Sequence, residues 1–142
     1  MSDDMDRRVE LTRTALGRYE AVNPRGGRIV IGAGAGADES FTPVELLLAA
    51  IAGCGAADVD HITVKRSEPE SFSVTMTGRK VRDDHGNHVE ELTLTFDLGF
   101  PGGEAGDAAR AVLPEAVRRS HDRLCTVSRT VELGTPVRNR VM

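Results

Sequence analysis

Aromatic side chains and cysteines are both scarce in this chain of 142 residues. It has no tryptophan, one tyrosine and four phenylalanines, so the stacking platforms typical of single-stranded nucleic-acid binding are missing. The core must therefore consist mainly of Leu, Val, Ile and Ala side chains, which contribute less buried area than aromatic ones. Such a thin core favours a homodimer that completes it.

The chain also lacks a block of charge of one sign. It carries 18 lysines and arginines against 22 acidic residues, a formal charge of -4, and the basic residues are scattered. This pattern excludes the basic footprint of a nucleic-acid or anionic-membrane partner. No apolar run follows the charged first residues, and no stretch reaches the 18 or so apolar residues of a membrane span. We therefore expect a cytoplasmic protein with neither kind of partner.

Alternating apolar residues predict antiparallel strands in three parts of the chain. Between residues 8 and 33 the alternation predicts two strands, arranged as a hairpin or meander around a turn at 23–27. A second region, from 71 to 100, alternates on both sides of a turn and predicts a long hairpin. The β-branched run over 126–133 predicts a final strand.

A long central helix is predicted over residues 42–63. Thr42 suits the N-cap, and Glu45 stands three residues later, which is the spacing of a capping box. Residues 46–57 carry no charge, so we expect this helix to be buried on nearly every side. Cys54 lies in the middle of it.

Helical spacing returns over residues 105–122, where Pro114 should kink the helix or divide it in two. Strands, buried helix, hairpin, second helix and strand together indicate an α+β fold, with antiparallel sheets around the central helix. At roughly 100 to 200 residues per domain, residues 1–142 should form a single domain.

One stripe of the central helix is polar. On a helix of about 3.6 residues per turn, Asp58 and His61 lie within about 40° of Cys54, so the three share one face. The second helix offers His121 and Cys125, again about one turn apart. Two elements far apart in sequence therefore each supply a cysteine and a histidine.

A redox pair is the first interpretation of these residues. Cys54 would attack an oxidant as a thiolate, and Cys125 would resolve the sulfenic acid as a disulfide. The helix dipole is too distant to lower the thiol pKa of Cys54, since its effect falls off within the first turn. A cation has to do so, either His61 or an arginine, whereas Asp58 alone would raise that pKa.

Two other interpretations stay open. Cys54, His61, His121 and Cys125 form a Cys2His2 set compatible with zinc, although Cys54 and His61 start roughly 10 Å apart along the helix axis. Free cysteines are also commonly small buried hydrophobic residues. For Glu45 the capping box is a complete structural role, and for His121 so is a solvated position beside Asp122.

Two segments carry a resemblance to a known family. Residues 41–54 read FTPVELLLAAIAGC and residues 121–131 read HDRLCTVSRTV. Together they resemble the family of osmotically inducible protein C and organic hydroperoxide resistance protein (OsmC/Ohr). The resemblance implies an OsmC-like fold, an intertwined homodimer, and a thiol-dependent peroxidase that reduces organic hydroperoxides to alcohols. It assigns Cys54 the peroxidatic role and Cys125 the resolving role, with an external dithiol as reductant and with neither cofactor nor metal.

The resemblance also points to the residues around the thiols. Peroxidases of the family place a glutamate directly after the proline to orient an activating arginine, and Val44 stands there in this chain. The chain resembles a branch in which the glutamate comes one residue later, as Glu45, with Asp58 and His61 near the cysteine. One residue is about 100° on a helix, so Glu45 does not simply replace the missing carboxylate. Arg18 is the candidate activating arginine.

Other residues near the motifs have secondary roles in this interpretation. Arg129 is expected to contribute to packing or to be a charge on the surface of a strand. Leu47, Ile51 and Phe41 are expected either to form an apolar rim that favours organic over hydrogen peroxide or to be ordinary core residues. Val44 supports an alternative function. In it, a non-peroxidase dimer of the same fold binds a small apolar molecule or senses redox state.

Overall fold

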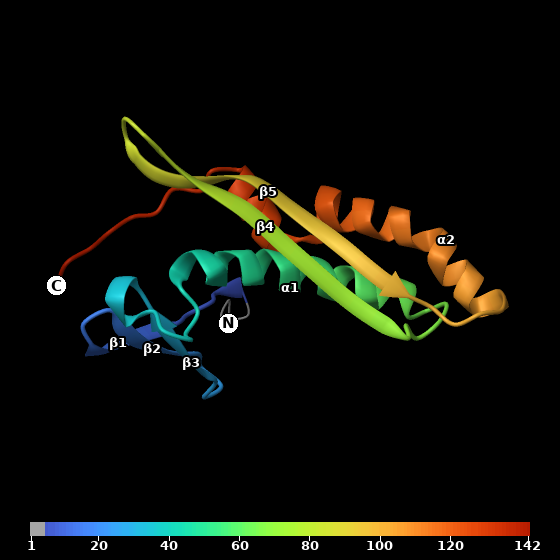
Figure 1. Cartoon of the computed structure of the whole chain (residues 1–142), viewed down its shortest axis with the longest axis horizontal. Helices are drawn as coiled ribbons and strands as arrows, with labels where there is room; N and C mark the ends of the chain where they lie inside the picture. Colours follow the sequence, from blue (N-terminus) through green and yellow to red (C-terminus); the bar gives the residue numbers. More distant parts are fainter. Residues whose placement is uncertain (1–4) are drawn as a thin grey trace. The chain divides into compact units, whose positions relative to one another are not determined.

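The fold was determined as a computed structural model that describes residues 5–142. Strands and helices form the predicted α+β architecture with antiparallel sheets (Figure 1). In chain order the elements are β1 (Glu10–Ala15), β2 (Arg18–Val22), β3 (Arg28–Gly32), the 3-10 turn η2 (Gly34–Gly36), α1 (Pro43–Thr63), β4 (Ser71–Asp83), β5 (Gly86–Gly99), α2 (Glu104–Arg119), the π-helical turn η3 (Ser120–Leu124) and α3 (Thr126–Glu132).

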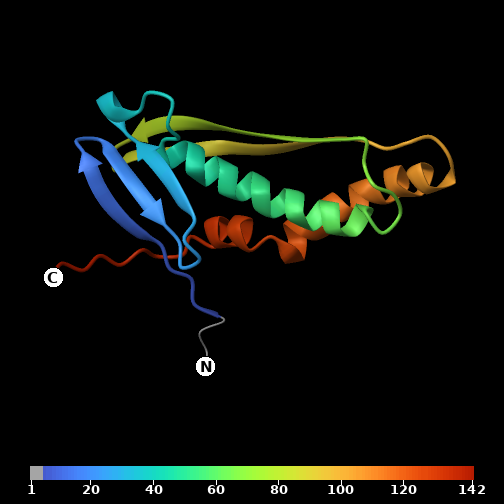
Figure 2. The same cartoon turned by 90° about the horizontal axis from the view of Figure 1, so that it is seen from below.

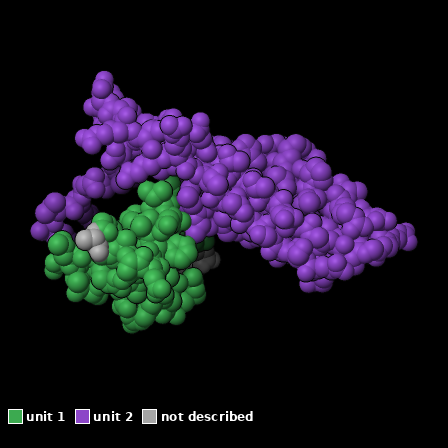
Figure 3. Space-filling view, in the orientation of Figure 1, with its two compact units in different colours: residues 1–47 green, residues 48–142 purple. Residues whose placement is uncertain are grey.

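The chain divides into two compact units, residues 1–47 and residues 48–142 (Figure 3). The first holds the three short strands and the start of α1, and the second holds the rest of α1, the long hairpin and the C-terminal helices. The single domain over 1–142 stays a prediction.

The first unit is a three-stranded antiparallel meander in the order β1-β2-β3. The sequence pattern predicted only two strands here, and the difference lies in the tight turn between β1 and β2. Gly17 takes the left-handed conformation in that turn (φ +72°), and a Cβ there would lie 2.5 Å from the carbonyl oxygen of Ala33. Only glycine fits this position, so one apparent strand becomes two.

Helix α1 begins with the predicted capping box. The Thr42 amide donates to the Glu45 carboxylate at 2.9 Å, and the Glu45 amide donates to Oγ1 of Thr42 at 3.3 Å. The expected burial on nearly every side is wrong for the single chain, in which the buried residues form one stripe. That stripe consists of Ile51, Gly55, Val59 and Thr63.

The opposite side of α1 is exposed in the single chain, notably at Ala49, Ala50, Gly53 and Ala57. Within residues 5–142, α1 is also the helix whose length and mean hydropathy of 1.4 would suit a membrane span. The core helix of a soluble protein meets the same description. Length and composition therefore do not separate the two cases.

Strands β4 and β5 form the predicted long hairpin. Their register pairs Val74 with Phe96 and Met76 with Leu94, so apolar side chains line one face. Oδ1 of Asp83 accepts hydrogen bonds from the amides at the turn, which sets its geometry. Helix α1 and the C-terminal helices lie on the same side of this hairpin (Figure 2).

The C-terminal region differs from two predictions. Helix α2 runs unbroken through Pro114, so the predicted division is wrong, and the alternative of a kink at Pro114 stays a prediction. A strand was predicted over residues 126–133, but residues 126–132 form α3 and Leu133 caps its C-terminus. Their β-branched side chains misled the sequence interpretation, because Val127 and Val131 are one helical turn apart and the segment has a side-chain cap at Cys125.

Candidate functional site

The second unit brings both cysteines together with a carboxylate. Cys54 and Asp58 are one turn apart on α1, and Cys125 lies at the junction of η3 and α3. The two sulfur atoms and a carboxylate oxygen of Asp58 all lie within 4.8 Å of one another. Both cysteines are free thiols, Cys54 partly exposed and Cys125 buried. Two residues 71 positions apart in the sequence thus share one site.

Gly55 lets the hairpin pack closely against α1 beside Cys54. A Cβ at Gly55 would lie 2.9 Å from Cδ2 of Leu94 and 3.4 Å from the Phe96 ring. Gly53, one residue before the cysteine, faces open space, since a Cβ there meets no atom of the described chain within 4 Å. Of the two glycines that flank Cys54, Gly55 is therefore closely packed and Gly53 is open.

Ser120 ties the two halves of the site together. Its side chain is buried, and its Oγ donates a hydrogen bond of 2.9 Å to Oδ2 of Asp58. Its carbonyl oxygen accepts the amide of Cys125 at 2.8 Å, which closes the π-helical turn. Sequence reasoning missed this residue. A usable signal was its helical spacing from the buried Ala109 and Ala116, which makes it a polar residue on an apolar stripe.

Cys125 is positioned by its own hydrogen bonds. Its thiol donates to Oγ of Ser128 at 3.2 Å, and its sulfur accepts the Ser128 amide at 3.4 Å. As the N-cap of α3, Cys125 has the place that a serine or aspartate takes in other helices. The thiol is thereby fixed by residues that follow it directly in the chain.

The surroundings of Cys54 favour the neutral thiol. Burial raises the pKa of Cys54, and the neighbouring Cys125 raises it further, while the backbone amides of Val127 and Thr126 lower it. Within residues 48–142, no lysine, arginine or histidine forms an ion pair with Asp58. Burial, Cys125 and the two backbone amides are thus the groups that set the pKa of Cys54.

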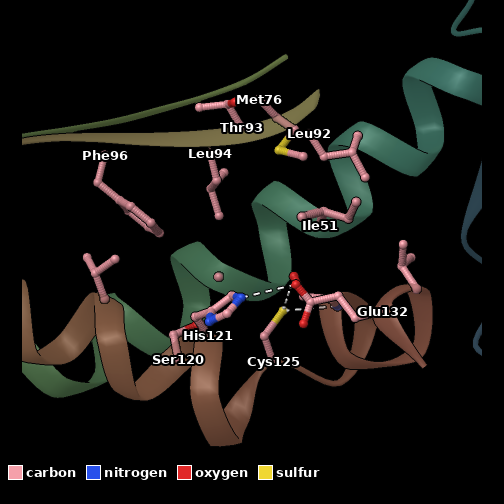
Figure 4. A pocket seen from close by; sticks show the side chains of 14 residues that line it. Ile51, Met76, Leu92, Thr93, Leu94, Phe96, Ser120, His121, Cys125 and Glu132 are labelled. Atoms are coloured by element: carbon pink, nitrogen blue, oxygen red, sulfur yellow. Dashed lines mark hydrogen bonds and ion pairs between the residues drawn. The ribbon is translucent and has the colours of Figure 1, made fainter. Parts of the chain in front are cut away.

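An apolar pocket opens beside the cluster (Figure 4). It has a volume of about 340 Å³ and lies between the apolar face of the hairpin and the η3 and α3 segment. Met76, Leu94 and Phe96 point into it from the strands, and Cys125 lies at its opposite wall. Ile51, expected in an apolar rim, is also among its lining residues. The pocket suits a small apolar group held next to a thiol.

The two histidines do not join the sulfur atoms. One ring nitrogen of His121 meets Asp122 and the other meets Glu132, each at 3.1 Å. These bonds, first that from Asp122, raise the pKa of His121. The expected solvated position beside Asp122 is thus present. His61 is exposed and is not a member of the Cys54 cluster.

The remaining candidate residues have roles in their own surroundings. In the first unit, Arg18 donates to the carbonyl oxygen of Gly36 at 3.2 Å and pairs with Asp38. A hydrogen bond from the Ser40 amide and the contact with Arg18 lower the pKa of Asp38. Glu45 has its place in the capping box, and Arg129, on α3, is exposed.

The proteins similar to this chain match it over most of its length. The family described as "OsmC-like protein" matches residues 36–139. An uncharacterized protein of Mycobacterium tuberculosis is 30% identical over 131 residues, 92% of either chain. A hypothetical protein from Aquifex aeolicus is 26% identical, with a TM-score of 0.71 over 92% of this chain and 89% of that one.

Functional names occur among the structural relatives. The organic hydroperoxide resistance protein OhrB of Bacillus subtilis has a TM-score of 0.60 and 16% identity, covering 89% of this chain and 90% of that one. At this identity the likeness establishes a common fold and no more.

Proposed function

Since the chain belongs to the family of OsmC-like proteins, we propose that it is a thiol-dependent peroxidase that reduces organic hydroperoxides through Cys54 and Cys125. The observation that carries this proposal is the approach of the two sulfur atoms to within 4.8 Å. A disulfide needs them at about 2.05 Å, a gap that modest side-chain and backbone adjustment can close. The name of the Bacillus subtilis relative supports the same chemistry.

The reaction has three steps. The Cys54 thiolate attacks the terminal oxygen of the hydroperoxide and breaks the O–O bond, which gives a sulfenic acid and, after protonation, the alcohol. Cys125 attacks the sulfenic sulfur, so a disulfide forms and water leaves. An external dithiol then reduces the disulfide to two thiols and is itself oxidised. The greater exposure of Cys54 supports its peroxidatic role, because the oxidant has to reach the first thiol.

Activation of Cys54 requires a positive charge. Burial and Cys125 raise its pKa, and only the amides of Val127 and Thr126 oppose them. Arg18 is the proposed cation, from the same chain or a second copy, and His61, Asp58 and Glu45 remain the other proposed site residues. The proposed working form is a cytoplasmic homodimer. Its support includes exposed apolar side chains such as Leu11 and Phe41, which are 55% and 54% accessible.

Consumption of cumene hydroperoxide, with dithiothreitol as reductant, tests the function. We expect turnover by the wild-type protein and background rates for Cys54→Ser, whose circular dichroism should stay native because a hydroxyl replaces a partly exposed thiol. The apolar pocket predicts faster turnover of cumene hydroperoxide than of hydrogen peroxide. A wild-type protein that consumes neither oxidant, or a Cys54→Ser protein with unchanged turnover, would exclude peroxidase function.

A second candidate is a non-peroxidase dimer that binds a small apolar molecule or senses redox state. Val44 at the position of the family's catalytic glutamate and the raised pKa of Cys54 favour it. Calorimetric titration with 2-phenyl-2-propanol, the alcohol product of cumene hydroperoxide, separates the two. Binding of this alcohol by a wild-type protein that shows no turnover supports the second candidate.

A further inference from the structure

The donor atoms of the cysteine cluster also fit a tetrahedral metal ion. In a zinc site with Zn–S of about 2.3 Å and Zn–O of about 2.1 Å, neighbouring ligand atoms are about 3.6 to 3.8 Å apart. The two sulfur atoms and the Asp58 carboxylate oxygen lie within 4.8 Å of one another, so each pair has to close by at most about 1.2 Å. All three ligands belong to the same compact unit.

The secondary structure gives these ligands suitable spacing. Cys54 and Asp58 are four positions apart on α1, so their side chains project from the same face of one regular helix. Cys125 approaches from the junction of η3 and α3. The set differs from the Cys2His2 combination that the sequence suggested. Both ring nitrogens of His121 already bond carboxylates, and His61 is outside the cluster.

Ser120 supplies the outer partner that ligating carboxylates usually have. Its buried Oγ donates to Oδ2 of Asp58 at 2.9 Å and thereby orients the carboxylate. This bond uses one of the several lone pairs of the Asp58 carboxylate and leaves the others available to a metal ion.

We propose that the reduced protein binds one Zn²⁺ through the sulfur atoms of Cys54 and Cys125 and a carboxylate oxygen of Asp58. Binding displaces one proton from each thiol, and water takes the fourth position of the tetrahedron. Zinc matches this donor set better than Mg²⁺ or Ca²⁺, which prefer sites made of oxygen ligands.

Metal binding and the redox reaction use the same sulfur atoms and exclude each other. A Cys54–Cys125 disulfide removes two of the three ligands, and a bound ion occupies both thiols. Zinc would thus protect the pair and hold the protein inactive until the metal is withdrawn. Zinc binding goes beyond the proposed function and does not rest on it, because binding requires only reduced thiols. The protective effect of zinc does rest on the proposed peroxidase reaction.

Anaerobic titration of the reduced, chelator-treated protein with Co²⁺ tests the site, with Zn²⁺ competition measured afterwards. We expect one Co²⁺ per chain, tetrahedral d–d bands in the visible and sulfur-to-cobalt charge transfer in the near ultraviolet, all abolished by equimolar Zn²⁺. Asp58→Asn keeps the shape of the side chain and an oxygen for Ser120. This substitution should weaken Co²⁺ binding by about 10- to 100-fold or more, because mutation of a residue that only hydrogen-bonds to a metal ligand already causes a loss of that size.

Matched variants separate binding at this cluster from binding elsewhere on the chain. Asp60→Asn, on an exposed position of the same helix, should bind like the wild type, as should His61→Ala and His121→Ala. Cys54→Ser and Cys125→Ser should each lose most of the charge-transfer intensity. The proposal is overturned if the reduced wild type takes up no Co²⁺, if Asp58→Asn binds as tightly as wild type, or if a histidine variant loses the ion.

The outcome is independent of peroxidase activity. The titration contains no peroxide, and turnover is measured separately on metal-free protein. A protein that turns over but binds no ion fails only the metal proposal, and one that binds the ion without turnover fails only the peroxidase proposal.

Discussion

The two cysteines are held in different ways. Cys54 lies in the middle of α1, a regular helix of 21 residues with a capping box at its start and a buried stripe along its length. Cys125 lies between a π-helical turn of five residues and a helix of seven. Its place depends on the hydrogen bonds that Ser120 and Ser128 make with it.

This difference suggests that the Cys54 side of the site is rigid and that the Cys125 side is mobile. A long packed helix keeps its geometry when one side chain changes, whereas a short segment held by a few hydrogen bonds rearranges at low cost. We therefore expect the Cys125 side to move when the sulfur atoms approach each other. Substitutions on either side of the site test this contrast.

Removal of a thiol should change the reaction with hydroperoxide more than any other substitution. The effect should differ between the two cysteines. Cys54→Ser abolishes turnover, while Cys125→Ser leaves the first reaction with hydroperoxide intact. Without a resolving thiol, Cys54 then proceeds to sulfinic and sulfonic acid. Since each further oxidation consumes another hydroperoxide, mass spectrometry after an excess of cumene hydroperoxide measures this directly. Identical oxidation states of Cys54 in wild type and Cys125→Ser would contradict the resolving role.

Two glycine substitutions test the packing of the Cys54 side. Gly55→Ala puts a Cβ 2.9 Å from Leu94 and should lower the free energy of unfolding by about 1 to 3 kcal/mol, the usual cost of overpacking. Gly53→Ala adds a methyl group in open space and should raise it by about 0.5 to 1 kcal/mol through helix propensity. Urea unfolding measures both. A destabilised Gly53→Ala protein would indicate that another chain covers this face.

The pH dependence of alkylation reports the pKa of Cys54 and the influence of Cys125 on it. Because burial raises the pKa of Cys54, its reaction with iodoacetamide should reach half its maximal rate at a higher pH than that of an ordinary thiol. Cys125 contributes to this shift, so the midpoint should fall in Cys125→Ser. The experiment uses metal-free protein. An unchanged midpoint would show that Cys125 has no influence on Cys54.

The smallest effect is expected for the ion pair between His121 of η3 and Glu132 of α3, which contributes to the free energy of unfolding. Asp122 and Glu132 raise the pKa of His121, so its stabilising contribution is present below the unperturbed value of about 6.5 and is lost as the pH rises through the folded value. Glu132→Gln should therefore reduce the free energy of unfolding by about 0.5 kcal/mol at acidic pH, the size of an exposed pair, and have no effect at alkaline pH. Urea titrations at both pH values test the sign. A loss that is larger at alkaline pH would contradict it.

The same contrast explains what the sequence could predict. The central helix and the long hairpin have strong periodicity over many residues, so their type and their capping box could be predicted and are confirmed. The segment after Arg119 is short, and its conformation depends on tertiary bonds such as that from Ser120 to Asp58. Local propensity does not contain this information, and it favoured a strand where α3 forms.

The site could be predicted in part for the same reason. Helical spacing placed Asp58 beside Cys54, which the structure confirms, and the resemblance to the OsmC/Ohr family implied that Cys125 joins them. The sequence did not predict the roles of Ser120 and Ser128, because Ser120 lies outside the two quoted segments and Ser128 lies within the second one without a role assigned to it. The extent of burial of α1 was overestimated, since an uncharged helix can also owe its composition to a surface that a second chain would cover.

The most direct test of the account is the disulfide itself. Equal amounts of isotopically light and heavy protein, fully reduced and metal-free, are mixed, treated with one equivalent of cumene hydroperoxide per chain, and digested without reduction. Since the sulfur atoms meet within one chain, we predict a linked Cys54–Cys125 peptide that is entirely light or entirely heavy, with one cumyl alcohol formed per disulfide. Two free thiols after treatment, or linked peptides of mixed label, would contradict the account.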